Sequence, residues 1–187
     1  ILGLPFAERP TRKPIFNHRP DMSSGVATRL LEKLDQITFE LWDGNSYICG
    51  DCDILIIGGA GLLDPAFARG KPIINAHPGI IPTVRGLDSF KWSIHDNLDL
   101  GVTLHQIDEN VDAGKVLKVA RTPVFAEDAI QQLAARHFHL EISLLSNFLN
   151  FVDKACDIKT FPGPRRMRMN SATEKIMLER FDAWKAS

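Results

Sequence analysis

Three features are scarce in this sequence of 187 residues: cysteine, an excess of charge of one sign, and long apolar runs. The formal net charge is −1, so the overall charge does not favour binding to a nucleic acid or an anionic membrane. The longest apolar run, residues 54–57 and the glycines after it, is far shorter than the roughly 20 residues that cross a bilayer. We therefore expect a cytoplasmic protein without nucleic-acid or membrane partners.

Two of the three cysteines, Cys49 and Cys52, have the C-x-x-C spacing of thiol redox sites and of half a zinc site. Only Cys156 remains to join them, and no histidine lies at a short, regular spacing from the pair. A thioredoxin-type site also needs a helix directly after the first cysteine, whereas a strand is expected here. We therefore expect reduced thiols and no bound metal.

The length and the 44% content of hydrophobic residues are typical of one compact domain with a full core. Residues 1–154 are expected to form this domain. Residues 155–187, with an arginine-rich segment and a weaker helical pattern at 171–184, are expected to form a basic, helical tail. The chain begins at Ile1 rather than Met, which leaves open whether its N-terminal part is complete.

Two apolar segments predict the centre of the fold. Residues 54–57 are apolar, mostly β-branched, and followed by glycines, which predicts that residues 53–57 form a strand buried on both faces of a parallel sheet. A helical stretch from about residue 64 leads to a second buried strand at 72–75. Strand, helix and strand in this order predict a parallel crossover, whose ligands bind beyond the carboxyl ends of the strands. We expect an α/β, Rossmann-like fold with a mostly parallel sheet and helices on both faces.

The remaining elements follow from hydrophobic periodicity. Helices are predicted at residues 24–34, 87–96 and 127–154, and strands at 37–42, 102–107 and 116–119. The last helix carries an apolar stripe that should face the core: Ile130, Leu133, Ala134, Phe138, Leu145, Phe148, Leu149 and Val152. Glu141 lies on this face, where a carboxylate is costly unless it is paired. It is either a frayed, solvated position or a ligand of a substrate hydroxyl, while His137 and His139 are expected to be surface or helix-face residues.

Asn75, His77 and Asp112 carry the chemistry. Asn75 and His77 belong to the segment Asn-Ala-His-Pro-Gly at 75–79, and Asp112 to Val-Asp-Ala-Gly at 111–114. When an amine attacks an acyl carbon, Asn75 can donate to the developing oxyanion and His77 can donate or shuttle protons. Asp112 can hold that imidazole charged and oriented, which raises its pKa. No Ser or Cys lies in these segments, so direct attack is the simpler mechanism.

Five segments in register resemble the formyltransferases that use 10-formyltetrahydrofolate. They are Asn-x-His-Pro-Gly at 75–79, Ile-Ile-Pro at 80–82, Arg-Gly at 85–86, Gly-Val-Thr-Leu-His at 101–105 and Asp-Glu-Asn-Val-Asp-Ala-Gly at 108–114. The similarity extends from about residue 51 to about residue 153. It implies the formyltransferase fold, a one-carbon group transferase, and 10-formyltetrahydrofolate as co-substrate.

The resemblance assigns the family's catalytic residues to Asn75, His77 and Asp112, and a further family histidine to His105. The pterin of the folate would be held largely by backbone groups, to which small residues allow a close approach. The folate-binding residues would be Gly58, Gly59, Ala60, Gly61, Leu62, Leu63, Asn110, Val111, Ala113 and Gly114. Substrate contacts are assigned to His105, Arg85 and Glu141. Arg85 could instead fix its own loop, and His105 could be a hydrogen-bonded core residue. Arg165, Arg166 and Arg168 are expected to be a solvated basic run, with phosphate contact as the alternative.

The acceptor is expected to be the primary amine of a small, nucleotide- or phosphate-linked molecule. Glycinamide ribonucleotide enzymes of this family carry a Gly-rich, Ser-Asn phosphate loop that is absent from residues 1–50, and methionyl-tRNA enzymes add a C-terminal barrel and a basic surface. By elimination, a nucleotide-linked amino sugar fits best, and glycinamide ribonucleotide or methionyl-tRNA is the alternative acceptor. A 10-formyltetrahydrofolate hydrolase and a non-catalytic folate- or nucleotide-binding module remain alternatives. The oligomeric state stays open, with a homodimer as one option.

Overall fold

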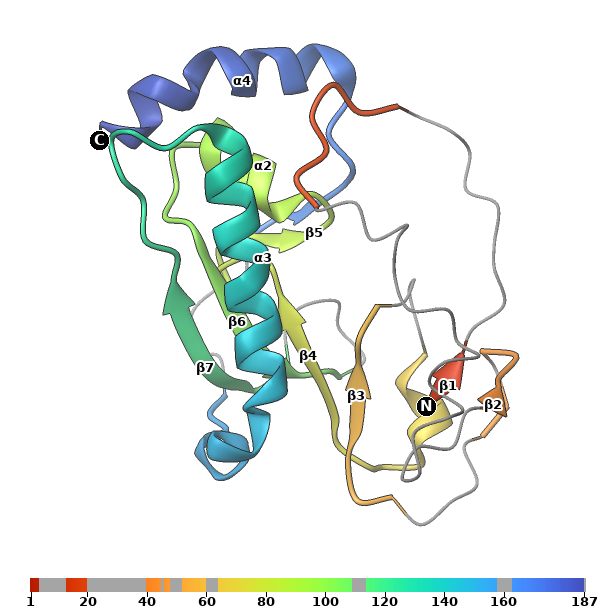
Figure 1. Cartoon of the computed structure of the whole chain (residues 1–187). Helices are drawn as coiled ribbons and strands as arrows, with labels where there is room; N and C mark the ends of the chain where they lie inside the picture. The colour runs from red at the N-terminus through yellow and green to blue at the C-terminus, as the bar shows by residue number, and fades with distance from the viewer. Residues whose placement is uncertain are drawn as a thin grey trace.

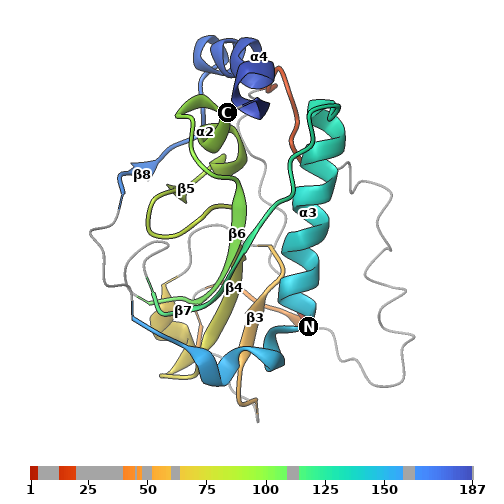
Figure 2. The ribbon, with the colours of Figure 1, turned by 90° about the vertical axis from the view of Figure 1, so that its left-hand side faces the viewer.

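The structure is a computed structural model that describes residues 1–3, 13–19, 40–44, 46–47, 52–59, 64–108, 114–157 and 163–186. At its centre lies a four-stranded sheet in the order β3, β4, β6, β7. These strands span Leu55–Ile57, Ile73–His77, Gly101–Gln106 and Val116–Arg121. The helix α3, Ile130–Ser146, covers one face of the sheet, and β5 (Arg85–Gly86) and β8 (Arg165–Arg166) lie on the other side (Figures 1 and 2).

The sheet is mixed, with both parallel and antiparallel pairs. β3 pairs in parallel with β4, as the predicted crossover requires. Parallel pairing also joins β5 to β8, and β1 (Leu2–Gly3) to β2 (Glu40–Leu41). Within the four-stranded sheet, the pairs β4–β6 and β6–β7 are antiparallel. Over the three sheets of the described residues, three of the five strand pairs are parallel. The predicted α/β class is confirmed.

The side chains of β4 alternate between the two faces of the sheet. Ile74 shares a core cluster with residues of α3, so it faces this helix. Ile73 packs instead against the 3-10 turn η1, Pro65–Ala68, which occupies part of the helical stretch predicted from residue 64. Since Asn75 and His77 follow Ile73 at intervals of two, they lie on the face turned away from α3.

The helix α3 joins two core clusters. Its first turns bury Ile130 and Leu133 against α2, Ser89–His95, and α4, Ser171–Lys185. A later turn buries Leu144 against side chains of β4 and β6. The helical period of the apolar stripe therefore predicted a core-facing surface correctly for most of its residues. Because one helix contributes to both clusters, α2 and α4 have a fixed place relative to the sheet.

Two details of the predicted elements are wrong. The strand at 53–57 is not buried on both faces: Ile56 is 47% exposed, because β3 has β4 on one side and no other described strand on its other side. The helix predicted to residue 154 ends at Ser146. The side-chain amide of Asn147 donates to the Ser143 carbonyl at 2.8 Å, beside the backbone N–H of the same residue at 3.1 Å, and so caps the last turn.

Two 3-10 turns follow α3, η2 at Phe148–Asn150 and η3 at Val152–Lys154. They turn Leu149 out of the core to 67% exposure, whereas the sequence predicted it as part of the apolar stripe. The helix predicted at 24–34 lies outside the described residues. The strand predicted at 37–42 is described only at its end, as β2.

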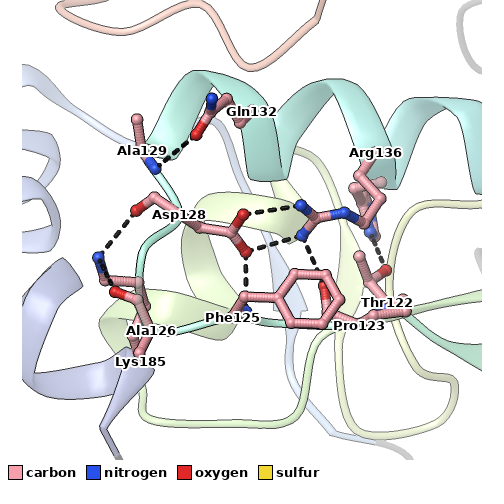
Figure 3. Close-up of polar contacts among 10 residues, drawn as sticks. Thr122, Pro123, Phe125, Ala126, Asp128, Ala129, Gln132, Arg136 and Lys185 are labelled. Carbon is pink, nitrogen blue, oxygen red and sulfur yellow. Dashed lines mark hydrogen bonds and ion pairs between the residues drawn. The ribbon is translucent and has the colours of Figure 1, made fainter.

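The carboxylate of Asp128 fixes the loop before α3 (Figure 3). It accepts a hydrogen bond from the Phe125 N–H at 2.8 Å and pairs with two guanidinium nitrogens of Arg136 at 2.7 Å each. The hydrogen bond from Arg136 lowers the pKa of the Asp128 carboxyl, against the opposing effect of burial. Lys185, at the end of α4, donates to the carbonyls of Ala126 at 3.2 Å and Asp128 at 2.8 Å. The C-terminal helix is therefore attached to the loop that begins α3.

The C-terminal segment packs onto the rest of the molecule. Met169, Met177 and Phe181 belong to the same core cluster as Phe90 of α2. The side chain of Asn170 begins α4 by accepting a hydrogen bond from the Thr173 N–H at 2.9 Å. The domain boundary at residue 154 stays a prediction, although these contacts show that α4 is not a detached helix. Among the described residues, no helix has both the length and the apolar character needed to cross a membrane.

Residues 13–19, which we call the strap, contribute Phe16 to the core cluster shared by α2, α3 and α4. In Figure 1 they form the red segment beneath α4. The Glu174 carboxylate accepts the N–H groups of Ile15 at 2.9 Å and Phe16 at 3.2 Å, and it pairs with the Lys91 ammonium. The side chains of Lys91 and Glu174 are 3% and 0% exposed. Burial raises the pKa of Glu174, but the hydrogen bonds from Lys91 and the strap lower it by more. This one carboxylate therefore holds together the strap, α2 and α4.

Candidate active site

Asn75 and His77 lie in the last three residues of β4, which extends further than the predicted strand and includes both side chains. In the antiparallel pairing with β6, Asn75 is opposite His105 and His77 is opposite Thr103. Residues paired in this way project from the same face of a sheet. His77, Thr103 and His105 are buried, and Asn75 is half-buried. The four side chains therefore form one polar cluster near the carboxyl end of β4.

The ring of His77 is held through Nε2, which lies 3.0 Å from the Val84 carbonyl oxygen and 3.1 Å from Ser89 Oγ. A carbonyl can only accept, so Nε2 must carry a hydrogen. The Ser89 hydroxyl donates to the Gly86 carbonyl at 3.0 Å, and its oxygen can accept from the same Nε2–H. With Nε2 fixed as a donor, Nδ1 is the ring atom through which His77 can gain or lose a proton.

Gly79 and Thr103 shape the loop that follows His77. A Cβ at Gly79 would lie 2.8 Å from His77 Nε2 and 2.7 Å from the Val84 oxygen, so a larger residue would displace the imidazole. The Thr103 hydroxyl donates to the Gly79 carbonyl at 2.8 Å and accepts from the Ile81 N–H at 3.0 Å. The Gly of the Asn-Ala-His-Pro-Gly segment is thus required by the position of its His.

Asn75 is oriented by His105. The Asn75 amide nitrogen lies 3.3 Å from His105 Nε2, and because an amide nitrogen can only donate, His105 must accept through this atom. An amide nitrogen carries two hydrogens, so the second can donate to another oxygen. The His105 and His77 rings meet edge to face, with centroids 6.2 Å apart. His105 is therefore a buried, hydrogen-bonded residue that orients Asn75, and its contact with a substrate stays a prediction.

A third histidine, His137 of α3, is buried near the same loop, and the predicted surface position is wrong. It is 3% exposed, its Nδ1 lies 2.7 Å from Thr122 Oγ1, and its ring centroid is 5.4 Å from that of Phe90. Burial lowers the pKa of His137 to about 3, while the Pro78 carbonyl acts in the opposite direction and His77 adds to the lowering. His137 is therefore a neutral residue behind the His77–Pro78 segment.

Acid should destabilise the protein through His137. Its folded-state pKa of about 3 lies below the ordinary value of 6.5, so its contribution is present above pH 6.5 and is lost as the pH falls toward 3. The expected loss from this residue approaches 1.4 kcal/mol per pH unit within that window. Urea unfolding of the parent and of His137→Gln at pH values from 7 to 4.5 would measure it. The variant should show the flatter dependence. Equal slopes, or an equal flattening by His139→Gln on the exposed face of α3, would refute this role of His137.

Residues 56–149 match the family model described as formyl transferase, which covers half of the chain. The matched range includes the whole Asn75, His77 and His105 cluster. The chain belongs to the formyl transferase family. The family predicted from the five sequence segments is confirmed.

Curated members of the formyl transferase family align with the central part of this chain. Phosphoribosylglycinamide formyltransferase of Haemophilus influenzae is 36% identical over 90 residues, which cover 45% of this chain and 42% of that protein. Methionyl-tRNA formyltransferase of Ehrlichia canis is 31% identical over 111 residues, 57% of this chain and 37% of that protein. The chain thus spans about two fifths of the length of these relatives.

Solved formyltransferase structures share the fold over a longer range. The formyltransferase PseJ of Anoxybacillus kamchatkensis, in complex with UDP-4,6-dideoxy-4-formamido-L-AltNAc and tetrahydrofolate, superposes with a TM-score of 0.56 at 22% identity. That match covers 86% of this chain and 90% of PseJ. A sugar N-formyltransferase from Shewanella sp. FDAARGOS_354 gives a TM-score of 0.58 at 18% identity, covering 76% of this chain and 67% of that one. The predicted Rossmann-like formyltransferase fold is confirmed.

The third family residue, Asp112, lies outside the described residues, as do the predicted folate-binding positions Ala60, Gly61, Leu62, Leu63, Asn110, Val111 and Ala113. Their roles stay predictions. Gly58 and Gly59 are exposed, and within the described part of the chain no atom lies within 4 Å of a Cβ built at either position. Gly114 is buried, and a Cβ there would lie 1.9 Å from the Gln106 carbonyl oxygen. The chain's own packing therefore requires a Gly at 114.

Arg85 and Glu141 both have partners within the protein. Arg85 Nη1 donates to the Gly163 carbonyl at 3.2 Å, which supports its role in fixing its loop. Glu141 Oε1 pairs with Arg19 Nη2 of the strap at 3.0 Å, so Glu141 is not a frayed, solvated position. Burial raises the pKa of Glu141, and Arg19 partly offsets this. Substrate contact by Arg85, His105 and Glu141 stays a prediction.

The basic run at 165–168 is only partly solvated, contrary to the sequence-based expectation. Arg166 pairs with Asp96, and its guanidinium carbon lies 4.8 Å from the centroid of the Trp92 ring. Arg165 and Arg168 are exposed. Of the C-x-x-C pair, Cys49 lies outside the described residues, while Cys52 is a free thiol whose Sγ is 3.5 Å from Lys71 Nζ.

Ser89 and His137 were not recognised as site residues from the sequence. Ser89 begins a short helix three residues after the Arg-Gly pair, and no pattern in the sequence marks its contact with His77. His137 could have been found, because it follows Leu133 and Ala134 at helical spacing and so belongs to the buried face. The polarity of a His side chain favours a surface position instead, and this is why the sequence did not predict a buried one.

Proposed function

We propose that this protein transfers a formyl group from 10-formyltetrahydrofolate to the primary amine of a small, phosphate-bearing molecule, with a nucleotide-linked amino sugar as the favoured acceptor. The observation that carries the proposal is the pair Asn75 and His77. Both side chains project from one face of β4, and each is oriented by a separate set of hydrogen bonds. A preset amide donor beside a preset imidazole suits acyl transfer through a tetrahedral oxyanion.

Asn75 would donate its second amide hydrogen to the formyl oxygen as the amine nitrogen bonds to the formyl carbon. His77 would exchange a proton through Nδ1, taking it from the attacking nitrogen or giving it to the folate nitrogen that leaves. The bond between the formyl carbon and that nitrogen then breaks, and the products are a formamide and tetrahydrofolate. Asp112 would keep the imidazole oriented and favour its charged form. No enzyme group is acylated in this scheme.

The acceptor class rests on elimination and on the fold. The sequence of residues 1–50 contains no Gly-rich, Ser-Asn phosphate loop. PseJ, of the same fold, holds a formylated UDP-sugar together with tetrahydrofolate, so that fold accommodates both ligands in that protein. Glycinamide ribonucleotide is the second candidate, since a phosphoribosylglycinamide formyltransferase is 36% identical over the aligned 90 residues. Both acceptors carry a phosphate group and a primary amine.

The purified protein is expected to convert 10-formyltetrahydrofolate to tetrahydrofolate when a suitable amine is present. Parallel assays with UDP-linked 4-amino sugars and with glycinamide ribonucleotide would measure the rate for each, with mass spectrometry of the formamide product. Release of formate without any amine would instead establish a hydrolase. Binding of folate without turnover of any acceptor would establish a non-catalytic module. Faster transfer to glycinamide ribonucleotide than to every sugar nucleotide would overturn the favoured acceptor.

A further inference from the structure

The strap ends beside the active site. The His18 ring stacks on the Phe90 ring, with centroids 5.8 Å apart and planes at 3°. Phe90 directly follows Ser89, whose hydroxyl lies 3.1 Å from His77 Nε2. The end of the strap and His77 are therefore separated by little more than the first turn of α2. The buried Lys91–Glu174 pair holds the strap in this position through the N–H groups of Ile15 and Phe16.

Arg19 is oriented by its partners, but these do not use all of its hydrogen-bond donors. Its Nη2 pairs with Glu141 Oε1 at 3.0 Å, and its guanidinium carbon lies 5.5 Å from the centroid of the Phe138 ring. This ion pair uses one of the five N–H groups of a guanidinium, and 43% of the Arg19 side chain is exposed. Glu141 can thus fix the direction of Arg19 on α3 while other N–H groups remain able to donate.

Arg168 approaches the same place from the C-terminal segment. The N–H of the next residue, Met169, donates to Asp88 Oδ2 at 3.0 Å, which places Arg168 near the start of α2. Arg168 is exposed, and no hydrogen bond or ion pair of its side chain occurs within the described part of the chain. Burial, followed by Lys91, lowers the pKa of His18 to about 4; Asp88 acts in the opposite direction, and Arg19 and Arg168 add to the lowering. The stacking of His18 on Phe90 and the bond from Met169 to Asp88 thus place Arg19 and Arg168, each one residue from these contacts, along the chain segment that begins α2.

We propose that Arg19 and Arg168 bind a phosphate group of the amine substrate, and that the strap, held by Glu174, sets their separation. The inference rests on the proposed function, because it takes that amine to be phosphorylated. A guanidinium can donate two parallel hydrogen bonds to phosphate oxygens. His18 Nδ1, which is buried and has no hydrogen-bond partner among the described residues, adds a polar atom beside them. The ligand chemistry is a phosphate monoester or diphosphate, in a ribonucleotide or a nucleotide-linked sugar.

Calorimetric titration of the full chain with UDP and, separately, with ribose 5-phosphate tests the subsite and distinguishes the two sources of phosphate. Tetrahydrofolate is present in every titration, so that the folate carboxylates do not compete. We expect one of the two probes to bind, and Arg168→Gln and Arg19→Gln each to raise its Kd roughly tenfold or more, as loss of charged hydrogen bonds predicts. Arg165→Gln is the matched control, because it removes the same charge three residues away and should change Kd less than about threefold.

Binding of neither probe to the parent protein would overturn the subsite. An equal loss in Arg165→Gln would also overturn it, since a diffuse positive field would then explain the binding. Arg168 is exposed, so its replacement should leave the unfolding temperature unchanged and keeps the test valid if Arg19→Gln is unstable. If Arg168→Gln loses UDP binding but the parent protein transfers no formyl group, the proposed function alone would be refuted. Normal transfer by Arg168→Gln, with unchanged Kd and unchanged KM for the amine, would refute the subsite alone.

Discussion

Replacing His77 by alanine is expected to slow formyl transfer by roughly 10²–10⁴-fold, as loss of a proton-transfer group usually does. The ring is buried, and Nε2 is held by the Val84 carbonyl and Ser89 Oγ, so the substitution also removes buried contacts and the stability of the variant must be measured beside its rate. Steady-state rates with 10-formyltetrahydrofolate and the acceptor found in the screen would measure the loss. Asp112→Asn should produce a decrease in the same range, although Asp112 lies outside the described residues.

His139→Ala is the matched control for this prediction. His139 is an exposed histidine on α3, and its replacement should leave the rate within a factor of about two. Ser89→Ala should fall between the two, because it removes one of the two acceptors that hold Nε2 while the Val84 carbonyl remains. If His77→Ala kept its rate within about tenfold of the parent, the mechanism would be wrong. Thermal unfolding of each variant would separate loss of chemistry from loss of structure.

Replacing Lys91 by methionine is expected to lower the free energy of unfolding by about 3–5 kcal/mol, because it leaves the Glu174 carboxylate buried and unpaired. Both side chains are almost fully inaccessible to solvent, and the carboxylate also accepts from the strap. Glu174→Gln should cost a similar amount, since it leaves a buried ammonium without a counter-charge. Urea unfolding at pH 7 would measure both changes.

Matched controls for the pair lie on α4 itself. Lys175→Met and Glu179→Gln change the same residue types at exposed positions of this helix and should alter stability by less than about 0.5 kcal/mol. In the double variant Lys91→Met with Glu174→Gln, the two losses should be less than additive, because neither charge is then left without a partner. A loss below 1 kcal/mol in either single variant would mean that water reaches the pair and that the strap is held by other contacts.

The position of Asn75 and His77 at the end of a strand could be predicted from the sequence because the information is local. An apolar β-branched run followed by Asn, His and Gly marks both the end of β4 and its polar side chains within seven residues. The helical period likewise identified α2 and most of α3. The end of α3 was misplaced because the apolar stripe continues past Ser146, whereas the Asn147 side chain caps the last turn there.

The contacts that hold the site could not be predicted, because they join residues far apart in the sequence. The N–H of Phe16 and the carboxylate of Glu174 are 158 positions apart, and neither residue type specifies the other. The contact between Ser89 and His77 depends on the conformation of the loop between them, which Gly79 and Thr103 shape. The exposure of Ile56 depends on which strands neighbour β3, and hydrophobicity alone does not indicate that.

The meeting of strap, α2 and α4 at Glu174 has a consequence for the order of folding during synthesis. The strap and the sheet emerge from the ribosome long before α4, yet the Lys91 ammonium and the strap N–H groups acquire their acceptor only when residue 174 is available. Contacts of such long sequence separation form late and slowly. The nascent chain should therefore carry an assembled sheet while the first turn of α2, which supplies Ser89 to His77, still lacks its support.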